Sequence, residues 1–94
     1  MENNVIYEKL LKKFSLNKQY VVAIEELAEL QKELTKALRS KGDIDHTAEE
    51  IADVEIMLEQ LKYYNRENQL SQKVEYWKLR KMRRIKEMVG IYEN

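Results

Sequence analysis

The sequence predicts an all-α fold, a four-helix bundle-type subunit, from its composition and its apolar spacing. Proline is absent and only two glycines occur in 94 residues, so few positions would interrupt a helix. Leu, Glu, Lys, Ala, Gln and Met fill much of the remainder, and these residue types favour helix. A chain of this length fits one domain, 1–94, which by itself buries only a modest fraction of its surface.

Four helices are expected, with short breaks between them. In the first, Ile6, Leu10 and Phe14 stand four residues apart and therefore share one helical face. The expected ranges are 4–14, 17–40, 45–65 and 69–89.

The ends of these helices are predicted from capping residues. Asn17 and Asp45 are the expected N-caps, because their side-chain oxygens can accept a hydrogen bond from the first helical turn. Lys41 and Gly42 should end the second helix, and Gly90 should end the fourth, because glycine readily adopts the left-handed conformation that closes a helix.

Composition excludes several classes of site. Cysteine is absent and His46 is the single histidine, so neither a disulfide framework nor a zinc site of thiolates or imidazoles can form. Any bound metal ion must therefore be held by oxygen atoms. No apolar run reaches the length of a membrane span, and residues 1–16 lack a basic start followed by an apolar core. We therefore expect a cytoplasmic protein that has no membrane partner.

Positive and negative charges are unevenly distributed, although the formal net charge is zero. Residues 25–59 contain eleven Asp and Glu against four Lys and Arg, whereas residues 73–87 contain seven Lys and Arg against two Glu. Such runs often form only the solvated faces of helices. The positions of the individual charges must decide between a surface role and a functional one.

Two acidic pairs stand on or beside the apolar faces of their helices. At about 100° per residue, Glu26 falls within the apolar arc of the second helix and Glu29 lies at its edge. Glu50 and Asp53 repeat this arrangement on the third helix, whereas Glu25 points away from its arc. Each helix therefore turns an acidic pair, spaced by three residues, toward the core.

Carboxylates gathered in an apolar setting are costly as bare anions, because burial and mutual repulsion both oppose ionisation. A divalent cation removes both costs, and magnesium prefers carboxylate, water and phosphate oxygens as ligands. The alternative is that these residues lie at the edges of amphipathic helices and extend their carboxylates into water.

The same residues resemble a family signature. The string EELAE at 25–29, followed after twenty residues by EIAD at 50–53, is similar to the EExxE and ExxD motifs of the MazG-like all-α nucleoside triphosphate pyrophosphohydrolases. The resemblance covers about 19–61 and includes the surrounding strings of both motifs.

The resemblance implies a site and a reaction. It assigns Mg²⁺, with Mn²⁺ as a substitute, to Glu26, Glu29, Glu50 and Asp53, and it implies hydrolysis of an NTP or dNTP to the monophosphate and pyrophosphate. A metal-activated water would be the nucleophile, and Glu25 or Glu29 would accept its proton. The small enzymes of this family also imply an intertwined homo-oligomer, a homodimer or a homotetramer.

The fourth helix supplies candidate substrate-binding residues. Lys78 and Lys81 fall within its apolar arc and Arg84 lies at its edge, so these cations could neutralise phosphate oxygens. Alternatively they could be solvated side chains or ion-pair partners of the acidic helices.

Two other functions are compatible with the sequence. A non-enzymatic helical interaction module would use the acidic pairs only as edge residues. A nucleic-acid binder would use the basic stretch 73–86, but the acidic middle of the chain would repel the phosphate backbone, so nucleic acid is not the expected partner.

Overall fold

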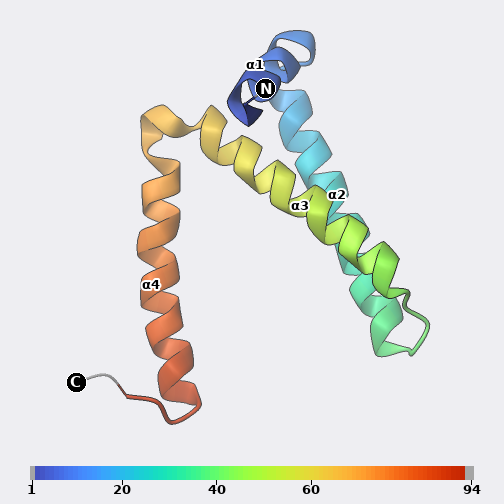
Figure 1. The fold of residues 1–94 in the computed structure, drawn as a ribbon, viewed down its shortest axis with the longest axis vertical. Coiled ribbons are helices and arrows are strands. Elements are labelled where there is room, and N and C mark those ends of the chain that lie inside the picture. Colours follow the sequence, from blue (N-terminus) through green and yellow to red (C-terminus); the bar gives the residue numbers. More distant parts are fainter. Residues whose placement is uncertain (1, 93–94) are drawn as a thin grey trace. The chain divides into compact units, whose positions relative to one another are not determined.

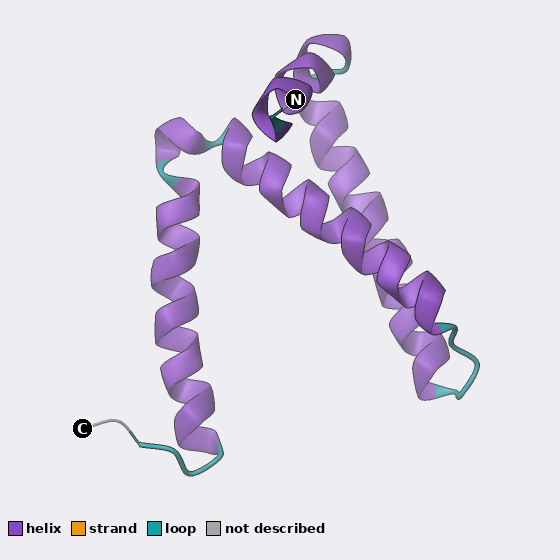
Figure 2. Cartoon of the chain, viewed as in Figure 1, coloured by secondary structure: helices purple, strands orange, loops and turns teal. Residues whose placement is uncertain are grey.

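The computed structural model describes residues 2–92, and these residues form helices and short loops without a strand (Figures 1 and 2). The predicted all-α class is therefore confirmed. Along the chain the elements are α1 (Asn3–Lys13), α2 (Leu16–Leu38), α3 (Ile44–Tyr64), the 3₁₀-helix η1 (Arg66–Asn68) and α4 (Leu70–Met88).

The chain divides into two compact units between Tyr64 and Asn65. The first unit contains α1, α2 and α3, and the second contains η1 and α4. That the two units together form the single domain 1–94 stays a prediction, as does the bundle-type subunit.

Within the first unit, α2 and α3 lie side by side and run in opposite directions (Figure 1). The small side chain of Ala23 is buried on α2, and Val54 and Met57 are buried on α3. Small residues allow helix axes to approach closely, and the longer apolar side chains fill the space that remains. This antiparallel pair is the scaffold on which the acidic residues stand.

Polar contacts join α1 to α3. The Tyr64 hydroxyl donates a hydrogen bond to the backbone carbonyl oxygen of Tyr7 at 2.9 Å. The Tyr63 hydroxyl donates to a Glu8 carboxylate oxygen at 2.7 Å. Tyr7 is the buried residue of α1, whereas Ile6 and Phe14 of the predicted apolar face are 42% and 41% exposed. The Tyr63 and Tyr64 hydroxyls are partly buried and need hydrogen-bond partners, and α1 supplies these partners where it docks on α3.

The N-terminal caps of α2 and α3 differ from those predicted. Ser15, not Asn17, caps α2, because its hydroxyl accepts a hydrogen bond from the Lys18 backbone N–H at 3.1 Å. Asp43 performs the same role for α3, where its carboxylate accepts from the Asp45 backbone N–H at 2.9 Å. Both predictions were wrong by two residues, since a capping side chain stands just before the helix.

The prediction at the end of α4 is confirmed, whereas the one at the end of α2 was wrong. Gly90 has a φ of 82°, the left-handed conformation expected after α4. After α2, Ser40 adopts this conformation with a φ of 56°. Gly42 serves another purpose, because a Cβ at that position would stand 3.1 Å from the Ala37 Cα. This contact is tight, so the turn favours glycine at position 42 for space.

Much of the predicted apolar surface is uncovered within each unit. On α2, Ile24 is 66% exposed and Leu38 is 88% exposed. No residue of α4 is buried, and Trp77 and Met88 are 54% and 77% exposed. Among the described residues, no helix has the length and apolar character needed to cross a membrane.

Candidate metal centre

Three carboxylates from two helices converge in the first unit. Glu26 comes from α2, and Glu50 and Asp53 come from α3. Each offers an oxygen atom, and these three oxygens all lie within 4.8 Å of one another. The antiparallel pairing of α2 and α3 brings Glu26 opposite the Glu50 and Asp53 pair, which share one face of α3 because three residues separate them.

The cluster is electrostatically strained. Partial burial raises the pKa of Glu26 above its ordinary value of 4.5, and the charge of Asp53 and a side-chain hydrogen bond with Asp53 raise it further. Burial also raises the pKa of Glu50, followed by the charges of Asp53 and Glu29. Each carboxylate therefore opposes the ionisation of its neighbours.

One oxygen of the cluster lacks a partner. The Glu50 Oε2 atom is buried and accepts no hydrogen bond from the residues that the structure describes. A buried acceptor without a donor costs free energy, and the cost is larger for a charged group. A cation bound among the three carboxylates would supply the missing partner. The donor set consists of oxygen atoms only, which fits Mg²⁺ or Mn²⁺.

The remaining predicted site residues of α2 are placed differently. Glu29 is exposed and is absent from the three residues whose oxygens converge, although its charge raises the pKa of both Glu26 and Glu50. Glu25 is also exposed, in agreement with its position outside the apolar arc. A role for Glu25 or Glu29 as proton acceptor stays a prediction.

The sequence analysis missed an ion pair next to the cluster. Glu33 on α2 is 7% exposed, and the Lys36 ammonium donates to its Oε1 atom at 3.2 Å. Glu33 follows Glu29 by four residues and Glu26 by seven, so all three lie on one face of α2. The helical projection places Glu33 on this face, but Glu33 lies outside the family motif and was therefore not singled out.

The predicted substrate-binding residues belong to the second unit. Lys78, Lys81 and Arg84 are exposed on α4, and the Lys78 ammonium lies 3.6 Å from a Glu75 carboxylate oxygen. Their proposed contact with a substrate held by the first unit stays a prediction.

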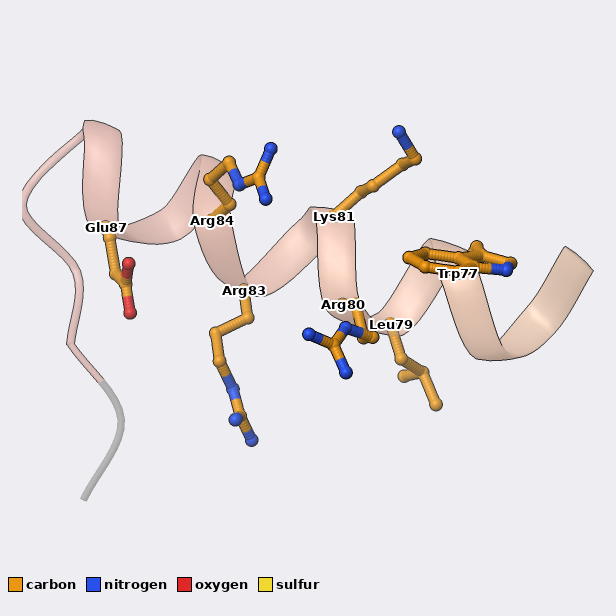
Figure 3. A pocket seen from close by; sticks show the side chains of 7 residues that line it. All are labelled: Trp77, Leu79, Arg80, Lys81, Arg83, Arg84 and Glu87. Carbon is orange, nitrogen blue, oxygen red and sulfur yellow. The ribbon is translucent and has the colours of Figure 1, made fainter.

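A shallow hollow on α4 does not bring these cations together. Figure 3 shows Lys81 and Arg84 pointing to one side of the helix, while Arg80 and Arg83 point to the other. The lining residues are Trp77, Leu79, Arg80, Lys81, Arg83, Arg84 and Glu87. Side chains that diverge around a single helix do not enclose a ligand.

Local contacts occupy part of this surface. The Arg80 guanidinium lies 5.7 Å from the ring centroids of both Tyr76 and Trp77 and donates a hydrogen bond to the Tyr76 hydroxyl at 2.8 Å. Stacking on aromatic rings is a common arrangement for an exposed arginine. The hollow on α4 is therefore a less well supported binding site than the carboxylate cluster of the first unit.

In comparisons with known proteins, no family model, curated protein or solved structure matches the chain. The resemblance to MazG-like enzymes consequently depends on the two acidic motifs and their surrounding strings.

Proposed function

We propose that this chain is a magnesium-dependent nucleoside triphosphate pyrophosphohydrolase of the MazG-like type, which converts an NTP or dNTP to its monophosphate and pyrophosphate. The supporting observation is the convergence of Glu26, Glu50 and Asp53 within 4.8 Å. These residues belong to the EExxE-like and ExxD-like strings at 25–29 and 50–53. Carboxylates that oppose one another's ionisation favour a divalent cation as their counterion.

Each acidic residue has a distinct proposed role. Glu26, Glu50 and Asp53 hold the magnesium ion, and Glu29 joins them as the fourth ligand. When bound, the ion neutralises the triphosphate and polarises the phosphorus–oxygen bonds under attack. A carboxylate oxygen of Glu25 or Glu29 accepts the proton of the attacking water, a role that solvent exposure of both residues permits.

The proposal includes a homo-oligomer, either a homodimer or a homotetramer, in the cytoplasm. Extensive uncovered apolar surface on α2, α3 and α4 supports it, because monomeric proteins seldom expose large contiguous apolar patches. Lys78, Lys81 and Arg84 bind substrate phosphates in the assembled protein.

A panel of NTPs and dNTPs with magnesium, assayed for pyrophosphate and monophosphate, tests the activity. We expect equal amounts of the two products from at least one nucleotide, and no turnover when EDTA removes magnesium. Glu26→Gln should abolish turnover while retaining helicity, and Glu55→Gln, which alters an exposed carboxylate of α3, is the matched control. The absence of pyrophosphate with every nucleotide would refute the proposal.

The uncovered apolar surface also favours a second candidate, a non-enzymatic helical interaction module. The two candidates differ in the effect of magnesium on thermal unfolding. An enzyme of the proposed type is stabilised by millimolar magnesium, whereas the interaction module is not.

A further inference from the structure

The ion pair of Glu33 and Lys36 is unusual for its location. Glu33 is the one charged residue among those that are buried within residues 2–92, and it stands on the same face of α2 as Glu26 and Glu29. Its charge is close enough to Glu50 to raise the pKa of that residue. A buried carboxylate added to an acidic cluster costs stability, and an apolar side chain of similar size would avoid this cost.

Lys36 provides the counter-charge and remains accessible. The Lys36 side chain is 37% exposed and that of Glu33 is 9% exposed, and 3.2 Å separates the ammonium from the carboxylate oxygen. Side chains on a helix lean toward its N-terminus, so the Lys36 ammonium reaches back toward the level of Glu33. At 1.5 Å per residue, that level is about 6 Å along the axis from Glu29 and about 10 Å from Glu26.

This position fits an anion bound to the metal centre. A triphosphate carries more negative charge than one magnesium ion neutralises, so its outer phosphate needs a further cation. Lysine is a common phosphate-binding side chain, which acts as a compact point charge.

We propose that Lys36 is a substrate-binding residue that contacts an outer phosphate of the metal-bound triphosphate, and that Glu33 is the positioning residue that holds its ammonium in place. This inference rests on the proposed function. It assigns the phosphate contact to the unit that contains the carboxylates, in addition to the cations of α4.

Calorimetric titration with inorganic tripolyphosphate in the presence of magnesium tests the proposal without requiring turnover. Lys36→Gln should weaken tripolyphosphate binding by about tenfold, the loss expected for one hydrogen bond to a charged group. The affinity for magnesium alone should be equal or tighter, because a nearby positive charge has been removed. Lys32→Gln, which removes an exposed lysine from the same helix, is the matched control and should behave as the wild type.

Glu33→Gln tests the positioning role. This variant retains Lys36 but removes the charge that holds it, so we expect weaker tripolyphosphate binding and a KM that rises more than kcat falls. Two results together would overturn the proposal and make Glu33 a metal ligand. Glu33→Gln would lower the affinity for magnesium alone, and Lys36→Gln would bind tripolyphosphate as the wild type does. Circular dichroism of each variant verifies that α2 and α3 are still folded.

The two proposals can fail separately. Equal tripolyphosphate binding by the wild type and Lys36→Gln, with pyrophosphate release intact, would overturn the role of Lys36 alone. A wild type that binds neither magnesium nor its tripolyphosphate complex, and that releases no pyrophosphate, would refute the proposed function and this inference with it.

Discussion

Asp53 is the residue that most strongly couples the acidic cluster. After burial, its charge is the largest cause that raises the pKa of both Glu26 and Glu50. The cluster therefore depends on one residue for much of its repulsion and, in the proposed function, for part of its attraction to a metal ion.

Replacing Asp53 should have opposite effects with and without magnesium. Asp53→Asn removes a repelling charge and should raise the melting temperature of the metal-free protein. The same variant should lose the stabilisation that magnesium gives the wild type. Thermal unfolding with EDTA and with millimolar magnesium measures both. A lower melting temperature in EDTA would contradict the electrostatic account of the cluster.

The pH dependence of stability follows from the raised pKa values of Glu26 and Glu50. A carboxyl whose pKa is higher in the folded state stabilises that state below the unfolded pKa, and the contribution is lost as pH rises through the folded pKa. In EDTA, the difference in melting temperature between the Glu26→Gln, Glu50→Gln double variant and the wild type should therefore widen as pH rises from 4.5 toward neutrality. Saturating magnesium should narrow this difference at neutral pH. A difference that stays constant with pH would show that folding does not raise the pKa values of these two residues.

Sequence reasoning predicted the three residues whose oxygens converge, but it also included Glu29, whose oxygens do not join them. Glu26, Glu50 and Asp53 could be predicted because helical periodicity and an antiparallel pair determine their faces. Glu33 was missed because it lies outside the family motif, although its spacing places it on the same face. Its partner could not be predicted, since an ion pair depends on side-chain conformation.

At the scale of the element, α2 begins after Ser15, whose hydroxyl oxygen accepts a hydrogen bond from the first helical turn. Ser15→Ala removes this acceptor and should lower the free energy of unfolding by about 1 kcal/mol. Asn17→Ala, inside the first turn, should have a much smaller effect. Urea unfolding followed by circular dichroism measures the two variants side by side. An equal loss of unfolding free energy in both variants would contradict the assignment of Ser15 as the cap of α2.

The bounds of the helices were predictable to within two residues, whereas the N-capping residues of α2 and α3 were not. Two capping residue types or positions compete at a boundary, Ser15 and Asn17 at α2 and Asp43 and Asp45 at α3, and only backbone geometry decides which one caps. The positive φ of Ser40 and Gln69 was equally hidden, because such residues seldom adopt this conformation. η1 was not expected, because a three-residue 3₁₀-helix has no apolar periodicity.

At the scale of the whole molecule, the exposed apolar faces predict self-association. Sedimentation at micromolar concentration should show a dimer or a tetramer, and the melting temperature should rise with protein concentration. Charged substitutions in exposed apolar positions, such as Ile24→Glu, should shift the equilibrium toward monomer. A monomer that sediments alone at every concentration would contradict the proposed assembly.

The arrangement of the two units could not be predicted from the sequence. Periodicity identifies the face that each helix would bury, but it does not say which neighbour covers that face. The α2–α3 pair is determined by a five-residue connection, which leaves antiparallel packing as the simple solution. No comparable constraint acts on the exposed residues of α4.

The single tryptophan makes the second unit separately observable by fluorescence. The single tryptophan, Trp77, stands half exposed on α4, whereas Tyr7 and Tyr64 are joined by a hydrogen bond in the first unit. Tryptophan emission shifts to shorter wavelength when the indole leaves water. The emission wavelength measured over a range of protein concentrations would therefore report the concentration at which α4 becomes covered. The native protein thus contains an intrinsic probe of assembly in α4, remote in sequence from the carboxylates whose chemistry is to be tested.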